Sequence, residues 1–146
     1  MAESYASVVI AAPARRVWQW FGDFGGLARW HPGIAELEME DGACPREVGA
    51  VRRLWLGDGS RVRERLVALD ELGHSHTYEM LEGPFPIRSY RATVRVRPVT
   101  ATGESFAEWW ARYDADAERE AELDRTFAEG VFATGLAELA RRHAEI

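Results

Sequence analysis

The chain has 146 residues, of which 47% are hydrophobic and 29% are charged, a composition typical of a folded globular protein rather than a disordered one. Its 24 acidic and 18 basic side chains give a net charge of −6, which disfavours binding to nucleic acid and to anionic membrane surfaces. The length suits one domain, predicted over residues 1–146, and no apolar stretch is long enough for stable membrane insertion.

The N-terminal part predicts one strand and two short helices. A β-branched run predicts a strand over residues 5–10, and Pro13 suits the first turn of a helix. Residues 14–21 carry one broad apolar face and predict that helix, which glycines then end. A second short helix is predicted over residues 27–30, before His31-Pro32-Gly33 turns the chain.

The middle of the chain predicts an antiparallel meander. Compact hairpin turns are expected at Gly57-Asp58-Gly59 and at Glu71-Leu72-Gly73. The six predicted strands cover residues 34–40, 49–56, 60–70, 74–82, 87–98 and 104–114.

The last segment predicts one long amphipathic helix over residues 118–143, with acidic side chains early and basic side chains late. Gly130 and Gly135 lie inside it, where each costs about 1 kcal/mol relative to alanine. Either glycine allows another element or a ligand to approach closely, or it is simply tolerated on a solvated face. Together the elements predict an α+β fold, in which a curved seven-stranded antiparallel sheet surrounds the C-terminal helix and encloses a cavity.

Two glutamates lie on strand faces that otherwise look apolar. Alternation along a strand places Glu64 with Val62, Leu66 and Ala68. A buried carboxylate is costly unless it is paired, neutralised or beside water, so a wet or ligand-filled cavity would explain Glu64. A satisfied salt bridge, or a bulge that turns the side chain outward, is the alternative.

The same pattern places Glu108 on one face with Phe106 and Trp110, and we expect this carboxylate in the cavity as well. Arg52 shares a face with Leu54 and Leu56, which makes it a third inward charge.

Such a cluster of Arg52, Glu64 and Glu108 either orients a polar ligand or shifts the pKa values of its members. As an acid-base site it would use Tyr78 or Tyr90 as a hydrogen-bond donor to a developing enolate or phenolate. The alternative is that Arg52 pairs with a glutamate and stabilises the sheet interior.

Other candidate sites are weaker. The arginines that recur at every second position fit the solvated outer face of a sheet better than a nucleic-acid surface. These are Arg61, Arg63, Arg65, Arg91, Arg95 and Arg97.

Cys44 is the only cysteine, and His74 with His76 lacks a good third ligand, so we expect no disulfide, no metal and no cofactor. A secretory signal is not evident, and a cytoplasmic location is expected.

Several motifs, in order, resemble the START-like helix-grip superfamily, also called SRPBCC or the polyketide cyclase/dehydrase and lipid transport family. The first is Ala12-Pro13-Ala14-Arg15-Arg16-Val17-Trp18, followed by Phe21, Asp23, Phe24 and Trp30-His31-Pro32. Further along the chain come Gly49-Ala50-Val51-Arg52, Glu64-Arg65-Leu66, Leu69-Asp70 and Tyr90. The resemblance implies the helix-grip fold over nearly the whole chain. It does not imply one activity, because this superfamily includes carriers, receptors and enzymes.

Residues 64–92 look similar to the plant abscisic acid receptors, although the loop at residues 57–59 is shorter than the receptors' gate loop. Trp30 stands where those receptors carry a pocket lysine. The similarity implies that the pocket is lined by Trp30, Arg52, Leu54, Leu56, Glu64, Tyr78, Met80, Ile87, Tyr90, Glu108, Phe127 and Val131.

Three functions follow as alternatives. The first is binding of a hydrophobic or aromatic, polyketide-like or lipid-like small molecule, anchored by Arg52, Glu64 and Glu108. The second is a polyketide cyclase or aromatase-like enzyme that uses Glu64, Glu108, Arg52, Tyr78 and Tyr90 in catalysis. The third is a partner protein with exposed tryptophans. We expect a monomer or a homodimer.

Overall fold

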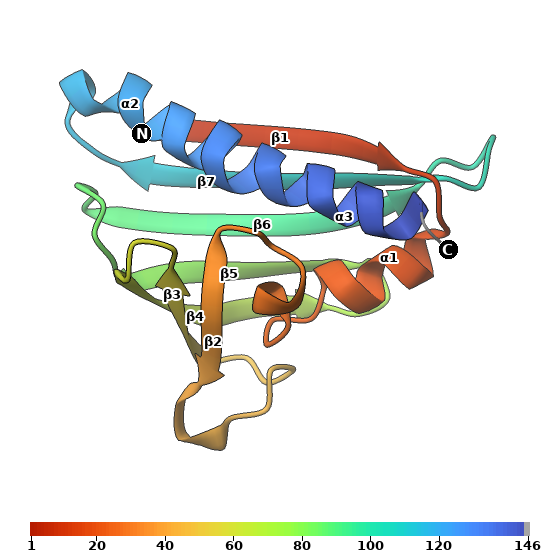
Figure 1. Cartoon of the computed structure of the whole chain (residues 1–146), viewed down its shortest axis with the longest axis horizontal. Helices are drawn as coiled ribbons and strands as arrows, with labels where there is room; N and C mark the ends of the chain where they lie inside the picture. The colour runs from red at the N-terminus through yellow and green to blue at the C-terminus, as the bar shows by residue number, and fades with distance from the viewer. Residues whose placement is uncertain (145–146) are drawn as a thin grey trace.

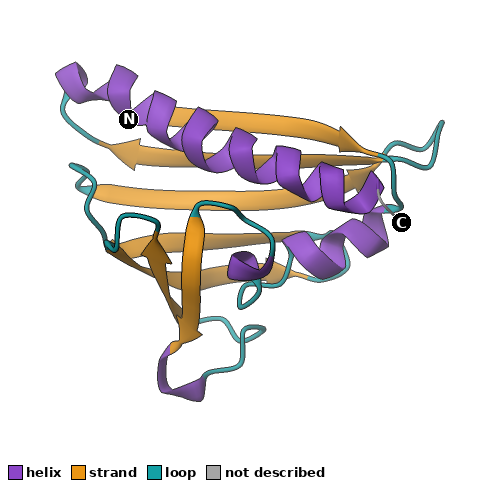
Figure 2. Ribbon diagram, in the orientation of Figure 1, coloured by secondary structure: helices purple, strands orange, loops and turns teal. Residues whose placement is uncertain are grey.

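The computed structural model describes residues 1–144 and has the predicted α+β helix-grip architecture (Figure 1). One antiparallel sheet has the strand order β1-β7-β6-β5-β4-β3-β2, and the C-terminal helical segments pack along one of its faces (Figure 2). The strands are β1 (Ala2–Ile10), β2 (Ile34–Met39), β3 (Val51–Leu56), β4 (Arg61–Asp70), β5 (Ser75–Glu82), β6 (Ser89–Pro98) and β7 (Ser105–Asp114). The helical segments are α1 (Ala14–Phe21), η1 (Leu27–Arg29), η2 (Glu40–Gly42), η3 (Ala117–Arg119), α2 (Glu120–Asp124), η4 (Arg125–Ala133) and α3 (Thr134–Ala144).

Strand β1 is longer than the β-branched run that predicted it. It pairs with β7 in unbroken register from Ala2 opposite Tyr113 to Ile10 opposite Ser105. The backbone hydrogen bonds to β7 therefore set the length of β1. This pairing also holds alanine and serine residues in the strand, although their own strand preference is low.

The C-terminal helix is continuous but changes its winding. Residues 125–133 form the π-helical segment η4, between the α-helical segments α2 and α3. At its end the Thr134 backbone N–H and hydroxyl both donate to the Glu129 carbonyl, the hydroxyl at 2.8 Å. The π-helix is rare, and short π-helical segments within α-helices often occur at functional sites. The predicted long helix is confirmed, whereas its π-helical winding was not predicted.

The two helix glycines have different surroundings. A Cβ atom on Gly135 would lie 2.5 Å from His31 Cδ2 and 3.0 Å from Trp109 Cζ3. A Cβ atom on Gly130 would meet only the Arg125 carbonyl, at 3.9 Å. Gly135 is therefore required for close approach of the helix to the sheet and to His31, and Gly130 is not required for space.

We expect Gly135→Ala to lower the free energy of unfolding by about 1–3 kcal/mol, because the methyl group overpacks a buried contact. The matched variant Gly130→Ala should raise it by up to about 1 kcal/mol through helix propensity. Urea denaturation of both variants measures the difference, and equal stabilities would contradict the steric role of Gly135.

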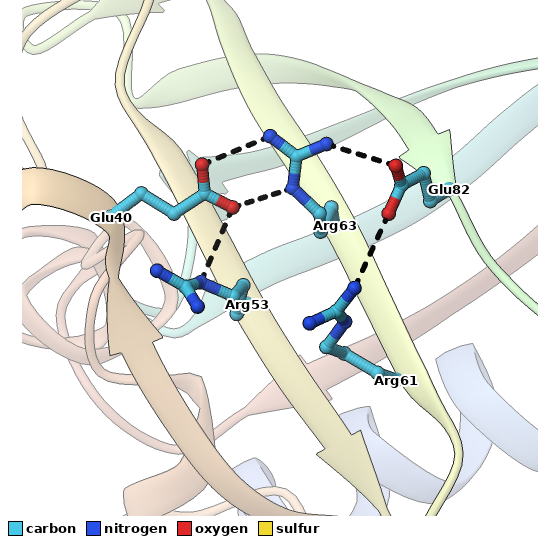
Figure 3. A network of polar contacts seen from close by, with 5 residues as sticks. All are labelled: Glu40, Arg53, Arg61, Arg63 and Glu82. Atoms are coloured by element: carbon cyan, nitrogen blue, oxygen red, sulfur yellow. Dashed lines mark hydrogen bonds and ion pairs between the residues drawn. The ribbon is translucent and has the colours of Figure 1, made fainter.

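The outer face of the sheet carries the alternating arginines, and most of them pair with glutamates. Figure 3 shows Arg63 between Glu40 and Glu82, with Arg53 and Arg61 bound to the same two carboxylates. The Arg63–Glu82 contact is 3.2 Å and the Arg53–Glu40 contact is 3.3 Å. The prediction of a solvated outer face is confirmed here, and the positive charge is largely balanced by these acidic partners.

None of the helices within residues 1–144 combines the length and the apolar character that a membrane-crossing helix needs.

Candidate functional site

A cavity of about 380 Å³ lies between the sheet and the π-helical segment η4. Strands β3 to β7 form its walls, η1 and the residues after it form a further side, and η4 supplies Thr126, Phe127, Gly130 and Val131. Most of the lining is apolar, which suits an apolar ligand.

Glu64 faces this cavity from strand β4. Val62, Glu64 and Leu66 are buried on the inner face, as alternation predicted. The register shifts between Leu66 and Ala68, and Ala68 is exposed. A bulge thus breaks the predicted alternation after Leu66, and Glu64 stays on the inner face.

Arg52 on β3 is the ion-pair partner of Glu64. The two residues are directly opposite each other in the β3–β4 ladder. Arg52 Nε donates to Glu64 Oε1 at 2.9 Å, and Arg52 Nη2 forms an ion-pair contact of 2.8 Å with the same oxygen. Arg52 Nη1 also donates to the Phe24 carbonyl at 2.9 Å. The predicted pairing of Arg52 with a glutamate is therefore confirmed.

The electrostatic balance at Glu64 favours a perturbed carboxyl group. Burial raises the pKa of Glu64, and the nearby Arg52 guanidinium opposes this shift by favouring the charged form. The side chain is almost fully buried, so desolvation is the larger cause. A carboxyl group in this setting is a candidate for proton transfer as well as for ligand binding.

Two tyrosines continue the polar part of the cavity wall. The Trp109 indole N–H donates to the Tyr78 hydroxyl at 3.0 Å. Burial raises the pKa of both Tyr78 and Tyr90, and the charge of Glu64 raises it further. Both phenols are therefore neutral hydrogen-bond donors near neutral pH.

His31 connects the η1 side of the cavity to η4. The Gly33 amide donates to His31 Nδ1 at 3.0 Å, so the ring proton lies on Nε2, which donates to the Val131 carbonyl at 2.8 Å. Burial lowers the pKa of His31, in agreement with a neutral ring. His31 lies in the predicted turn, where the Ile34 amide donates to its carbonyl at 3.2 Å, and its ring also binds the π-helical segment.

Glu108 does not lie in the cavity, and the prediction that it shares one surface with Glu64 is wrong. It lies on the outer face of β7, where the Tyr5 hydroxyl donates to Oε1 at 2.6 Å and Arg95 Nε donates to Oε2 at 2.9 Å. Arg95 also lies over the Trp110 ring. These side chains cover the carboxylate, so Glu108 is buried without belonging to the core.

Of the predicted lining, the structure brings eight side chains together around the cavity. They are Leu54, Leu56, Glu64, Tyr78, Met80, Tyr90, Phe127 and Val131. Four others lie elsewhere. Arg52 pairs with Glu64 but is not part of the lining, and Trp30 packs edge-on against Phe21. Ile87 packs against the core outside the lining, and Glu108 is on the outer face.

Sequence reasoning missed part of the lining. These residues are Leu27, His31, Gly33, Ile34, Val62, Phe85, Trp109, Thr126 and Gly130. Val62 shares the strand face of Glu64 and could have been found by alternation. Most of the others lie in turns or on the helix, where a position along the sequence does not predict which side chain reaches the cavity.

A metal centre has no support in the part of the chain that the structure describes, which holds no group of three His, Cys, Asp or Glu side chains suited to one ion. His74 lies in the turn before β5 with φ of +56°, and His76 is buried within β5. Both rings pack against Trp18.

Comparison with known proteins agrees with this architecture. A family model described as polyketide cyclase/dehydrase and lipid transport matches residues 1–144. A solution structure from Thermobifida fusca is 38% identical, covers 99% of this chain and 95% of its own, and has a TM-score of 0.90. The protein XoxI from Bacillus cereus is 28% identical, covers 99% of this chain and 97% of its own, and has a TM-score of 0.89.

A more distant structure shares the fold alone. The di-domain ARO/CYC BexL from the BE-7585A biosynthetic pathway is 19% identical, with a TM-score of 0.79 over 99% of this chain and 47% of its own. The search of curated proteins found no match. The family model covers nearly the whole sequence, and the chain therefore belongs to the polyketide cyclase/dehydrase and lipid transport family.

Proposed function

We propose that this protein binds a hydrophobic or aromatic small molecule in the cavity between the sheet and η4. The observation that carries the proposal is an apolar cavity of about 380 Å³ with one buried carboxylate, Glu64, in its wall. Pockets of this size, with few polar groups, take small organic ligands. Family membership supports the proposal, since the family is described by cyclase, dehydrase and lipid-transport functions.

Binding of the neutral fluorescent probe N-phenyl-1-naphthylamine tests this function. We expect the wild-type protein to bind the probe with a gain in fluorescence, because the probe leaves water for an apolar site. Val131→Trp fills part of the cavity and should weaken binding at least tenfold.

The matched control is Val9→Trp, which adds the same bulk at an exposed position of β1. It should leave probe binding unchanged. Absence of probe binding by the wild-type protein, or equal binding by both tryptophan variants, would contradict the proposed site.

A cyclase or aromatase-like enzyme is the second candidate. It is favoured by the raised pKa of Glu64 beside the neutral phenols of Tyr78 and Tyr90, with Arg52 as the positioning cation. Glu108 has no part in it, because it lies on the outer face. Turnover of a polyketide-like substrate that is lost in Glu64→Gln while binding persists would decide for the enzyme.

Two further expectations stay predictions. The similarity of residues 64–92 to the plant abscisic acid receptors is one, and the cytoplasmic location is the other. A partner surface built from tryptophans is not favoured, because even the most exposed of the six tryptophans, Trp20, has an exposed fraction of only 37%.

A further inference from the structure

Few hydrogen-bonding groups that line the cavity remain open to a ligand. Both ring nitrogens of His31 are already used, by Gly33 and by Val131. The indole N–H of Trp109 is used by Tyr78. The hydrogen bond from Arg52 Nε and the ion-pair contact of Arg52 Nη2 both go to Glu64 Oε1, and within residues 1–144 no donor bonds to Oε2. The buried cavity wall therefore presents one carboxylate oxygen without a partner.

The cation that balances this carboxylate is screened from the cavity. The Arg52 guanidinium lies between two rings, 4.1 Å from the centre of Phe24 and 4.7 Å from the centre of Tyr78. It also donates to the Phe24 carbonyl, and Arg52 is not among the cavity-lining residues. A ligand in the cavity thus meets an acceptor oxygen rather than the positive charge.

The remaining polar groups nearby are hydroxyls. Tyr78 and Tyr90 line the same cavity as Glu64, and Thr126 faces it from η4. A hydroxyl can both donate and accept. The site therefore offers the Glu64 carboxylate, ion-paired with Arg52 through its other oxygen, as an acceptor, together with hydroxyls that can donate.

We infer that the ligand of this cavity is a neutral apolar molecule with a hydroxyl group, an alcohol or a phenol, that donates to Glu64 Oε2, and that the site rejects carboxylates. The inference rests on the proposed binding function and adds the chemical class of the ligand's polar end. A hydroxyl group of the ligand can donate a hydrogen bond to Glu64 Oε2 and accept one from a tyrosine. A carboxylate would instead place a second negative charge beside Glu64.

Three naphthalene derivatives that differ in one substituent test the inference, by displacement of N-phenyl-1-naphthylamine at neutral pH. The derivatives are 2-naphthol, its shape-matched apolar analogue 2-methylnaphthalene, and the anion 2-naphthoate. A cavity that selects only for apolar character would prefer the methyl compound. We expect 2-naphthol to bind about tenfold more tightly than 2-methylnaphthalene, because a hydrogen bond to a charged group outweighs the added hydrophobicity. Binding of 2-naphthoate should be weaker still.

A pair of double variants assigns the preference to Glu64. Arg52→Met with Glu64→Met removes the inner ion pair and should abolish the preference for 2-naphthol over 2-methylnaphthalene. The matched control is Arg95→Met with Glu108→Met, which removes the outer pair and should keep the preference.

Wild-type protein that binds the probe but prefers 2-methylnaphthalene or 2-naphthoate would overturn the inference and leave the proposed function standing. Failure to bind the probe at all would overturn both. The comparison of the three naphthalene derivatives on the wild-type protein tests the inference even if the Arg52→Met, Glu64→Met double variant does not fold. A preference that survives in a folded inner double variant would also overturn the assignment to Glu64.

Discussion

Replacing Arg52 by methionine should lower the free energy of unfolding by about 3–5 kcal/mol at neutral pH. The change leaves Glu64 as a buried carboxylate without its cation, and the Phe24 carbonyl loses a donor. The stacking of the guanidinium between Phe24 and Tyr78 is lost as well. Chemical denaturation followed by far-ultraviolet circular dichroism measures the loss.

Two controls separate an uncompensated charge from a general packing defect. Arg52→Met combined with Glu64→Met should restore stability to within about 2 kcal/mol of wild type, because apolar groups of similar volume can replace a buried ion pair. Arg95→Met should cost about 1 kcal/mol or less, because the Arg95 side chain is 43% exposed and Glu108 keeps its bond from Tyr5. A single Arg52→Met variant as stable as wild type would show that the pair contributes little.

The two glutamates show how far alternation can predict a site. On β4 the inner face was identified correctly up to Leu66, because arginines alternate with Val62, Glu64 and Leu66 and leave one plausible core face. The bulge after Leu66 depends on how β4 pairs with β5, which the sequence of one strand does not reveal.

On β7 alternation could not decide between the faces. Trp109 and Trp110 are adjacent, so each face of the strand carries a tryptophan. The inner face carries the small residues Ala107 and Ala111, both fully buried, while Trp110 on the outer face is partly covered by Arg95. Small residues on a strand that meets a helix were the signal that could have placed Glu108 outside.

The fold as a whole was predictable because its elements are local and strongly patterned. Helix α1 begins and ends at the predicted residues, and each predicted strand is present. The cavity was less predictable because it depends on side chains from turns and on the π-helical winding of η4. Hydrogen bonds such as that from His31 to Val131 join residues 100 positions apart, and no local pattern encodes them.

His76 should make the protein sensitive to acid. The imidazole is buried beside Phe24 and Trp18, and burial, followed by the positive charge of Arg52, lowers the pKa of His76 to about 3. In the unfolded chain this histidine takes up a proton near its ordinary pKa of about 6.5. Between these two values the unfolded state binds a proton that the folded state does not, so the free energy of unfolding falls as the pH falls from about 6.5 towards about 3.

We therefore expect His76→Leu to remove part of the acid destabilisation. Leucine is apolar and of similar size, and His76 Nδ1 is buried without a hydrogen-bond partner in the described residues, so stability at pH 7 should change by only about 1 kcal/mol. At about pH 4 the variant should exceed the wild type by up to about 3 kcal/mol, since each pKa unit corresponds to about 1.4 kcal/mol. Urea denaturation of both proteins from pH 7 to pH 4 measures this difference, and carboxylates that titrate in the same range affect both proteins alike. Parallel stability curves for the two proteins would show that the fold accommodates a charged His76, and that Arg52 and the surrounding rings do not exclude its proton.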